Sequence, residues 1–396
     1  IYPELTTREK QDFFVQRGTL FVTGTDQTLV AGVDYVPPAA TSSAFVRITN
    51  SNYTGAGVSF DADSNFNPDA VTAYISDHED ITSSFTISRP PAAVGDTRVS
   101  WEIIEYTGLS GADNEMIVRD VGTVTYAGTS DTATGSPVSA VADAADVVVF
   151  ITGQYNPGAS TNDWMEGLST SAGNATTREP VFSRGQTGSI AARVSYAVVE
   201  YTGQNWKGHR AEHTYSGTPG TTEATSISPV NSLLRSFIHP QKRVAGASTG
   251  LDDYGQQVGL SSIGALSLQL NSGNDVAADN TAVVWVIENT QTSDGAINVY
   301  RVSGSVDANE AVEPRTTSVA FGSTVGQISN VSLSISNDST GPGAAYPRPI
   351  LGATVASTTH FELFEADAGQ TQEYRVEIIG WPVADVAVRQ NYYRVY

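Results

Sequence analysis

Residues 209–213 have residue types at a spacing that binds zinc in some proteases. Their sequence is HRAEH, with His209 and His213 four residues apart and Glu212 beside the second histidine. Two histidines at that spacing share a zinc ion when they lie on one face of a helix. This stretch opens the third of four repeated units, and the first two units open with β-rich segments at residues 19–23 and 122–126. Its place in the repeat therefore predicts a solvated strand, in which the two histidines lie about 13 Å apart at about 3.3 Å per residue. We therefore expect a strand here and no metal site.

A second stretch, residues 61–65 with the sequence DADSN, begins like the calcium-binding loop of an EF-hand. That loop needs glycine at its sixth position and glutamate at its twelfth, where this chain has Phe66 and Thr72. An EF-hand is therefore excluded. The residue types favour an Asx-rich turn, and a looser calcium site that combines the two aspartates with Asp69 stays open as the alternative.

Two glutamates recur at matched positions, Glu105 and Glu200, and paired carboxylates perform acid–base catalysis in glycosidases. They lie 95 residues apart at the ends of different strands, so they are not expected to converge. We expect each to have a role inside its own unit, such as pairing with the arginine 16 residues before it, Arg89 or Arg184 respectively. The chain also lacks a nucleophile elbow, a P-loop and a dinucleotide-binding motif. The sequence therefore predicts no catalytic residues, no cofactor and no enzymatic activity.

Two tryptophans, Trp164 and Trp206, lie among small polar residues outside the predicted central strands. An exposed aromatic ring in a loop can stack on a sugar, and tryptophan also forms hydrophobic plugs and subunit contacts. We therefore expect each of these two residues to form a hydrophobic plug or a subunit contact, with glycan contact as the alternative.

The chain contains an internal repeat, which has to be found before a fold is assigned. Residues 98–108, RVSWEIIEYTG, return as residues 193–203, RVSYAVVEYTG, with seven of eleven positions identical. A Ser-Arg dipeptide upstream of the first copy returns at the same offset of 95 residues. Weaker copies follow at residues 283–290 and 374–381. We infer four units.

The repeat has a small set of structural anchors, which are arginines, aromatic residues and glutamates at matched positions. They are Arg89, Trp101, Glu105, Arg184, Tyr196, Glu200, Trp285 and Glu288. Trp285 lies one position out of line with Trp101, which indicates either sequence drift or a β-bulge. Successive side chains of a strand point to opposite faces, so Ile103 and Ile104 point in opposite directions. Both faces of this strand are expected to be covered, as in a central strand.

Short β-rich segments separated by Gly, Pro, Asn and Asp predict an all-β fold. We expect four tandem β-sandwich-like domains in series, arranged as beads or a rod. The predicted boundaries are an N-terminal arm at 1–17, then repeats at 18–108, 109–203, 204–290 and 291–396, with the last two divergent.

The two ends of the chain carry further signals. Residues 6–9, TTRE, have the form of a helix capping box, and one or two helical turns are expected to end at Phe13 and Phe14. Residues 386–396, a segment rich in tyrosine, are expected to form a final strand, with pairing to a neighbouring subunit as the alternative.

Charge and composition exclude several classes of protein. The chain of 396 residues has a net charge of −21 and no cysteine, so it contains no disulfide and no thiolate metal site. A strong negative charge repels nucleic acid and anionic membranes, and no apolar run approaches the length of a membrane span. Charged residues make up 16% and hydrophobic residues 40% of the chain, which is typical of a globular protein.

The repeat resembles a known family. Residues 15–19, VQRGT, are similar to the opening of repeat domains in structural proteins of tailed bacteriophages, and Arg89 with residues 99–106 resembles their closing strand. Arg184 with residues 194–201 has the same pattern, so the resemblance covers about half of the chain. Units 3 and 4 depart from it, and Gly380 stands where the first units have glutamate. The resemblance implies a virion component.

The leading hypothesis is a non-enzymatic virion structural protein, such as a tail fibre, a tail accessory protein or a head-decoration protein. It would face outward and act through contacts with other virion proteins, as a homo-oligomer, most simply a trimer. The alternative is a secreted or cell-surface adhesin that binds host glycans. A third hypothesis, a polysaccharide depolymerase, lacks the expected carboxylate cluster. None of these involves nucleic acid, a membrane or a cofactor.

Overall fold

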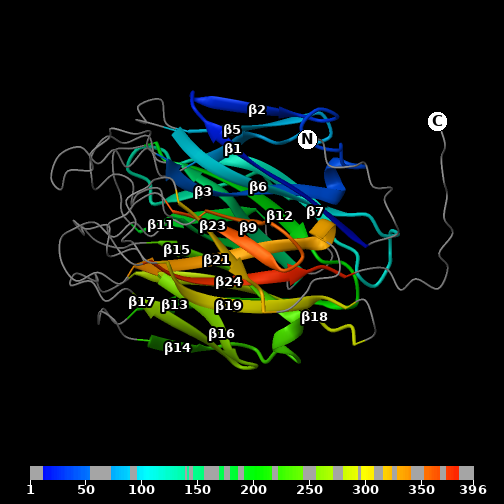
Figure 1. Ribbon diagram of the computed structural model, residues 1–396, viewed down its shortest axis with the longest axis vertical. Helices are drawn as coiled ribbons and strands as arrows, with labels where there is room; N and C mark the ends of the chain where they lie inside the picture. The colour runs from blue at the N-terminus through cyan, green and yellow to red at the C-terminus, as the bar shows by residue number, and fades with distance from the viewer. Residues whose placement is uncertain are drawn as a thin grey trace.

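The computed structural model describes residues 12–53, 73–89, 96–138, 141, 146–155, 169–173, 179–185, 191–215, 222–243, 256–270, 280–292, 296–306, 315–322, 328–339, 352–365 and 372–382. They form 24 β-strands and three short 3₁₀ turns, η1 (Thr41–Ser43), η5 (Leu233–Arg235) and η7 (Ile328–Asn330), which confirms the predicted all-β fold (Figure 1). No helix among these residues is long and apolar enough to cross a membrane.

Unit 1 is a sandwich of two three-stranded antiparallel sheets. Its strands are β1 (Phe13–Val22), β2 (Asp26–Val30), β3 (Ala44–Tyr53), β4 (Tyr74–Asp77), β5 (Ser84–Ser88) and β6 (Asp96–Tyr106). One sheet has the order β1-β6-β3 and the other the order β2-β5-β4. The first sheet therefore contains the first, last and third strands of the unit, with the last strand in the centre.

The other three units have the same number of strands. Unit 2 contains β7 (Ile117–Thr125), β8 (Thr132–Thr134), β9 (Val147–Tyr155), β10 (Ser169–Gly173), β11 (Pro180–Arg184) and β12 (Arg193–Glu200). Unit 3 contains β13 (Trp206–Thr214), β14 (Thr222–Ser226), β15 (Ser236–Arg243), β16 (Gln256–Ser262), β17 (Ala265–Leu270) and β18 (Thr281–Asn289). Unit 4 contains β19 (Asn298–Val306), β20 (Arg315–Ala320), β21 (Val331–Ser339), β22 (Gly352–Val355), β23 (His360–Glu365) and β24 (Gln372–Gly380).

Each unit repeats the strand order of unit 1. The sheets β7-β12-β9, β13-β18-β15 and β19-β24-β21 correspond to β1-β6-β3, and we call these four the central sheets. The second, fifth and fourth strands of each unit form its outer sheet. The outer sheet of unit 3 and the central sheet of unit 4 are joined by one residue pair, Gln256 with Asn337, into a six-stranded sheet.

The last strand of unit 1 is covered on both faces, as its alternation predicts. Ile103 packs inside the unit with Trp101, Phe85 and the other residues between its two sheets. Ile104 points the other way, into a hydrophobic core to which all four units contribute. Because the central sheets are apolar on both faces, each needs a second covering layer beyond its own sandwich.

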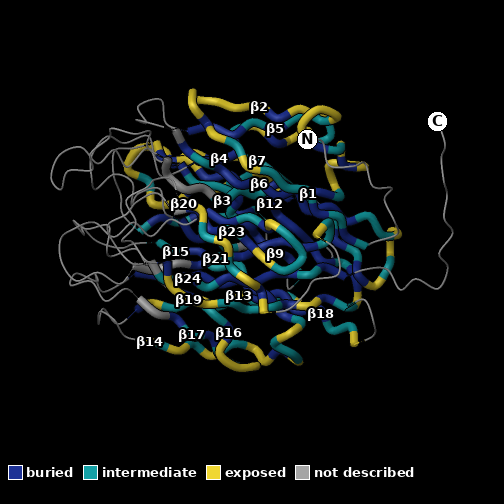
Figure 2. The backbone as a smooth tube through the Cα atoms, in the orientation of Figure 1, coloured by how far each residue is buried: buried dark blue, intermediate teal, exposed yellow. Residues whose placement is uncertain are grey.

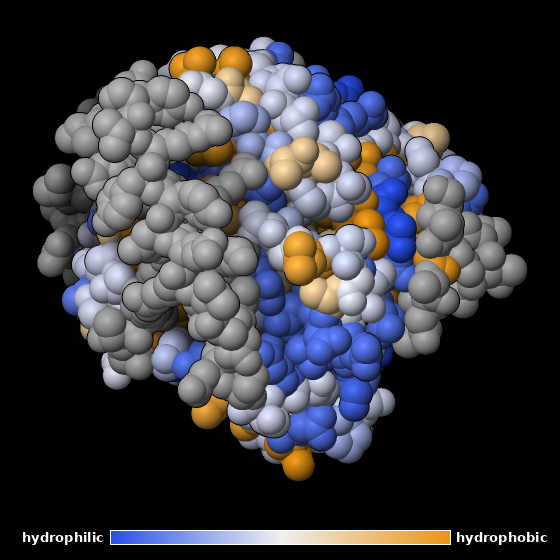
Figure 3. All heavy atoms as spheres, turned by 90° about the vertical axis from the view of Figure 1, so that its right-hand side faces the viewer, coloured by the Kyte–Doolittle hydropathy of each residue, from blue (hydrophilic) through white to orange (hydrophobic). Residues whose placement is uncertain are grey.

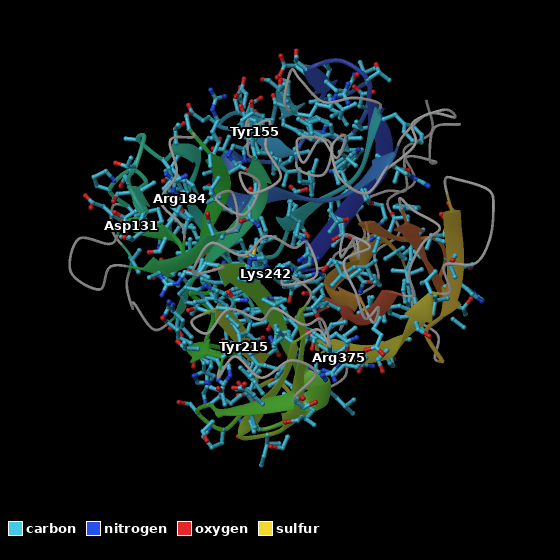
Figure 4. All side chains as sticks on the ribbon, turned by 90° about the vertical axis from the view of Figure 1, so that its left-hand side faces the viewer. Asp131, Tyr155, Arg184, Tyr215, Lys242 and Arg375 are labelled. Atoms are coloured by element: carbon cyan, nitrogen blue, oxygen red, sulfur yellow. The ribbon has the colours of Figure 1, made fainter. Side chains whose placement is uncertain are left out.

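The four units therefore surround a shared core, and the expected rod is wrong. Viewed end-on, unit 1 lies at the top, unit 2 at the left, unit 3 at the bottom and unit 4 at the right (Figure 4). Unit 4 contacts unit 1 through β21 and β22, so the chain closes a ring. Buried backbone runs through the middle of this ring, and exposed backbone lies on outer strands such as β2 (Figure 2). A rod would leave the second face of every central sheet in water.

Aromatic side chains from β1 and from the residue after β24 meet in the shared core. Phe13 stacks on Trp381 with ring centroids 4.7 Å apart, and Trp206 lies 6.0 Å from Phe13 and 6.2 Å from Trp381. Phe237 contacts Trp381 edge-on at 5.3 Å. Units 1, 3 and 4 are thus held together by rings that are far apart in the sequence.

The start of the first unit differs from its predicted boundary. β1 begins at Phe13, because Phe13 to Gln16 continue the pairing with β6 as far as Tyr106. Phe13 and Phe14 are therefore strand residues and do not end a helical turn. The capping box at residues 6–9, the aspartates of residues 61–69 and the C-terminal residues 386–396 lie outside the described residues.

Gly18 is required by a close approach of Trp101 across the sheet. A Cβ atom at Gly18 would lie 2.6 Å from Cζ2 of the indole ring, and Trp101 is packed between Tyr35 and Phe85. We expect Gly18→Ala to lower the free energy of unfolding by about 1–3 kcal/mol, the usual cost of overpacking a core. Gly24→Ala is the control, since its added Cβ meets nothing within 4 Å. Urea unfolding of both variants tests this, and equal stabilities would contradict it.

Candidate functional site

The two arginine anchors hold the same turn in units 1 and 2. Arg89 donates to the carbonyl oxygens of Thr23 at 2.7 Å and Gly24 at 2.6 Å. Arg184 donates to those of Gly128 at 2.7 Å and Ser130 at 2.8 Å. Both turns connect the first strand of a unit to its second. The repeated arginine is therefore a structural residue that fixes this connection.

The glutamate anchors bond partners within their own units. Glu105 accepts a hydrogen bond from the backbone N–H of Ala39 at 2.8 Å, and Glu288 accepts one from Asn231 at 2.5 Å. Ala39 and Asn231 both lie just before a 3₁₀ turn that leads into a third strand. Glu200 instead forms an ion pair with Arg119. Glu105 and Glu200 thus bond within their own units, as expected, and the partners seen here are Ala39 and Arg119.

The aromatic anchors divide between the two faces of the central sheets. Trp101 and Tyr196 lie inside their own sandwiches, where Tyr196 packs on Phe182 with ring centroids 5.1 Å apart. Trp285 lies on the opposite face, and its Nε1 donates to the hydroxyl of Ser171 in unit 2 at 3.2 Å. The register of β18 is regular on both sides, so the offset is sequence drift and not a bulge. A shift by one residue moves a side chain to the other face of a sheet.

Neighbouring units are connected by one recurring contact, which we call the latch. In each latch, a polar side chain of one unit bonds the backbone of the fourth strand of the preceding unit. The hydroxyl of Ser195 accepts from Ile75 N at 3.1 Å between units 1 and 2. The Gln241 amide oxygen accepts from Ser171 N at 2.7 Å between units 2 and 3. Both backbone groups lie in fourth strands, β4 and β10.

The remaining two latches use a hydroxyl that bonds both backbone groups of one residue. Ser336 accepts from Val258 N at 3.1 Å and donates to its carbonyl at 3.2 Å. Thr49 bonds Ala353 in the same way, with both distances 3.2 Å. This last latch joins unit 4 to unit 1. We call the whole region where two neighbouring units meet a joint. Each of the four joints contains one latch, and the four joints form a closed cycle.

The latch position is the same in each third strand. Gln241, Ser336 and Thr49 all occupy it, and unit 2 has Gly153 there. A Cβ at Gly153 would lie 2.9 Å from the carbonyl oxygen of Ala73, the residue before β4, so no side chain fits. Ser195, which pairs with Gly153, supplies the hydroxyl instead.

Buried charge reinforces the joint between units 4 and 1. Glu102 lies between Arg17 and Arg47, with its carboxylate 2.8 Å from Nη2 of Arg47 and 3.8 Å from Nε of Arg17. Both arginines also donate to carbonyl oxygens of β21, those of Val331 and Leu333. The three side chains are only 9–12% exposed. Burial lowers the pKa of Arg17, which Glu102 opposes.

The joint between units 3 and 4 repeats this arrangement with one arginine fewer. Arg301 lies 2.8 Å from Glu377 and donates to the carbonyl oxygen of Ser236. Glu377 accepts from the N–H of Ile238 at 2.6 Å, as Glu102 does from Leu333 at 3.3 Å. Burial raises the pKa of Glu377. The same construction thus closes the ring and joins two consecutive units.

A buried asparagine, Asn114, ties together the connections between units. Its Nδ2 donates to Asp12 at 2.9 Å and to Gln291 at 3.0 Å, and its Oδ1 accepts from Asn205 at 2.9 Å and Asn289 at 3.1 Å. These partners lie before β1, between units 2 and 3, and at the start of the connection between units 3 and 4. Burial raises the pKa of Asp12.

A groove of about 910 Å³ lies beside the joint between units 1 and 2. It is lined by β7, by β8 and the residues after it, and by Thr41, Ser42 and Glu79 of unit 1. Burial raises the pKa of Asp120 in this groove, Glu79 adds to the rise, and the hydroxyl of Tyr196 donates to Asp120 at 2.7 Å. Its lining of hydroxyls and carboxylates suits hydrogen bonding to a polar ligand.

The remaining predicted residues divide into three cases. Trp206 is the first residue of β13 and only 3% exposed, so the prediction of an exposed loop was wrong. Trp164 lies outside the described residues. Residues 209–213 lie in β13, which confirms the predicted strand, and His213 bonds Glu223 at 2.8 Å. No group of three or more histidines, aspartates and glutamates that could hold a metal ion occurs in the described part of the chain.

Sequence reasoning missed the latch residues and the two charged joints. Small polar residues within strands have no distinctive pattern, and Arg17 and Glu102 resemble surface residues of an ordinary strand. An alignment of the four units at their third strands was the one available signal, since it places Thr49, Gln241 and Ser336 in one column.

The face in Figure 3 is mainly hydrophilic where its residues are described, with apolar residues in small separate patches. Comparison with family models, with curated proteins and with solved structures found no match.

Proposed function

We propose that this protein is a non-enzymatic structural component of a tailed-phage virion that acts through protein–protein contacts. The observation that carries the proposal is that the buried polar groups described above bond one unit to another. The latches, the backbone contacts of the two arginine–glutamate pairs, and Asn114 all connect one unit to another. A closed ring in which every sandwich packs against two neighbours suits a scaffold.

Charge supports an outward-facing position on the particle. The net charge of −21 is unfavourable beside packaged nucleic acid and favourable for solubility at a surface. A tail fibre, a tail accessory protein and a head-decoration protein all fit this position. Copies of the ring are expected to associate with each other as a trimer and with other virion proteins.

Electron microscopy of purified particles tests the proposal. We expect density for the ring on the outside of the particle, at a position and copy number given by the reconstruction. A protein found only as a soluble monomer, and absent from every particle fraction, would overturn the proposal.

The groove beside β7 supports a second candidate, a secreted or cell-surface adhesin that binds glycans. We expect Asp120→Asn to abolish glycan-array binding under this alternative, because a carboxylate accepts sugar hydroxyl hydrogen bonds more strongly than an amide. Asp80→Asn is the matched control, since Asp80 only bonds Thr82 and Ser83 in an exposed turn. Trp164→Ala tests the predicted loop contact. Absence of any binding by the unmodified protein would remove this candidate.

A further inference from the structure

Unit 2 is flanked by two histidines, one from each neighbouring unit. His78, between β4 and β5 of unit 1, reaches the backbone of Gly122 in β7. His239, in β15 of unit 3, reaches the backbone of Ile151 in β9. Each side chain thus lies in a joint of unit 2, and neither is used by the latches.

His78 is held neutral by its surroundings. Its Nε2 lies 3.1 Å from the carbonyl oxygen of Gly122, and a carbonyl only accepts, so Nε2 carries the proton. Its Nδ1 is buried and has no hydrogen-bond partner among the described residues, and the residue is 2% exposed. A second proton would therefore place a buried charged N–H where nothing accepts it.

His239 is held neutral in a different way. Its Nε2 accepts a hydrogen bond from Ile151 N at 3.1 Å, so this nitrogen cannot take a proton while the bond exists. The ring packs on Phe150 with centroids 4.9 Å apart. Arg47 of unit 1 is close enough to disfavour a positive charge on the ring. Protonation would break the bond to unit 2 and add a charge beside this arginine.

The pKa values agree with this geometry. Burial lowers the pKa of His78 to about 4, although the Gly122 carbonyl and Asp77 oppose the shift. Burial, with Arg47, lowers the pKa of His239 to about 3. Other charged groups at the joint of His78 include Glu79 and Asp120, which border the groove, and Arg193, which donates to the hydroxyl of Tyr74 at 2.6 Å.

We propose that acid opens the ring at the two joints of unit 2, while the joint between units 3 and 4 stays closed. This inference concerns a conformational response and is independent of the proposed function. The joint between units 3 and 4 depends on Glu377, whose pKa is raised by burial. Protonation of that carboxyl removes a buried charge and leaves Arg301, which at 25% exposed is more accessible to water than Arg17 and Arg47, whereas protonation of either histidine adds a buried charge.

The direction in which pH changes the stability of the two joints follows from the two lowered pKa values. An exposed histidine has a pKa of about 6.5, so the closed joints are fully stable above that pH and lose stability as pH falls below it. Each histidine shifts the opening equilibrium by up to about tenfold per pH unit, and the two together by up to about 100-fold. The loss continues until the pH approaches the pKa of each buried ring.

Fluorescence energy transfer on the full chain tests the proposal, because the absence of cysteine allows clean labelling. The variant pair Val33→Cys and Thr134→Cys reports the joint between units 1 and 2, and the pair Ile263→Cys and Ser318→Cys reports the joint between units 3 and 4. Between pH 7.5 and pH 4.5 we expect transfer to fall for the first pair and to hold for the second. Constant transfer for both pairs, or an equal fall in both, would overturn the proposal.

Variants that cannot titrate separate this mechanism from general acid unfolding. His78→Gln with His239→Gln keeps an amide donor toward Gly122 and an amide acceptor toward Ile151, and we expect it to stay closed at pH 4.5. His360→Gln, at an exposed histidine, should open as the unmodified protein does. Opening of the double variant at the same pH as the unmodified protein would contradict the proposal.

If the double variant does not fold, the acid-opening proposal can still be tested on the unmodified protein. Nuclear magnetic resonance of the imidazole groups should then show two histidines that remain neutral down to pH 5 in the closed ring. Titration of all five histidines near pH 6.5 would overturn the proposal.

Discussion

Glu102→Gln is expected to lower the free energy of unfolding by about 3–5 kcal/mol. The substitution keeps the shape of the side chain and removes its charge. Arg17 and Arg47 then remain buried at the joint between units 4 and 1 without an anionic partner, since each is about 12% exposed or less. Removing one member of a buried ion pair costs far more than the pair itself contributes, because the remaining charges stay desolvated.

Glu212→Gln is a matched control for this experiment. Glu212 also lies between two arginines, Arg210 at 2.9 Å and Arg243 at 3.6 Å, but it is 42% exposed on the surface of unit 3. An exposed ion pair contributes about 0–1 kcal/mol, so this variant should unfold at nearly the same urea concentration as the unmodified protein. Similar effects of the two substitutions would show that the ring is not closed by buried charge.

Trp381→Ala is expected to have an effect of the same size, about 3–5 kcal/mol, through loss of packing in the shared core. Trp381 is 2% exposed and contacts Phe13 of unit 1 and Phe237 of unit 3. Its Nε1 also donates to the hydroxyl of Ser332 at 2.8 Å, which the substitution leaves without that donor. Leu109→Ala, at a residue 81% exposed, should change stability by less than about 0.5 kcal/mol.

A double-mutant cycle tests whether the effect of Trp381→Ala depends on the contact between units 1 and 4 that closes the ring. Phe13 and Trp381 stack at 4.7 Å, so Phe13→Leu and Trp381→Ala should be coupled by about 0.5–1.5 kcal/mol. The two residues lie at opposite ends of the described chain, and in a rod they would not interact. Additive effects in urea unfolding would therefore contradict the ring.

Much of the fold could be predicted from local sequence pattern. The repeated RVS…EYTG strand identified four units, and the opposed Ile103 and Ile104 indicated a strand that is covered on both faces. The extended conformation of residues 209–213 also followed from their place in the repeat. Each of these inferences needs only the alternation of side chains along a strand.

The arrangement of the units could not be predicted in the same way. Alternation shows that a second face is buried but does not identify what covers it, and here the cover comes from other units. Trp206 was expected in a loop because its neighbours are small and polar, whereas its ring fills the shared core. The contacts of Arg17 with Val331 join residues 314 positions apart, which no local pattern encodes.

The meeting of Phe13 and Trp381 has a consequence for the order of the units along the chain. Every unit has a neighbour on both sides, so units 4 and 1 pack against each other as consecutive units do. A circularly permuted chain, cut between units 2 and 3 and joined across the present ends, should build the same ring. The packing would then be independent of which of the four sandwiches comes first.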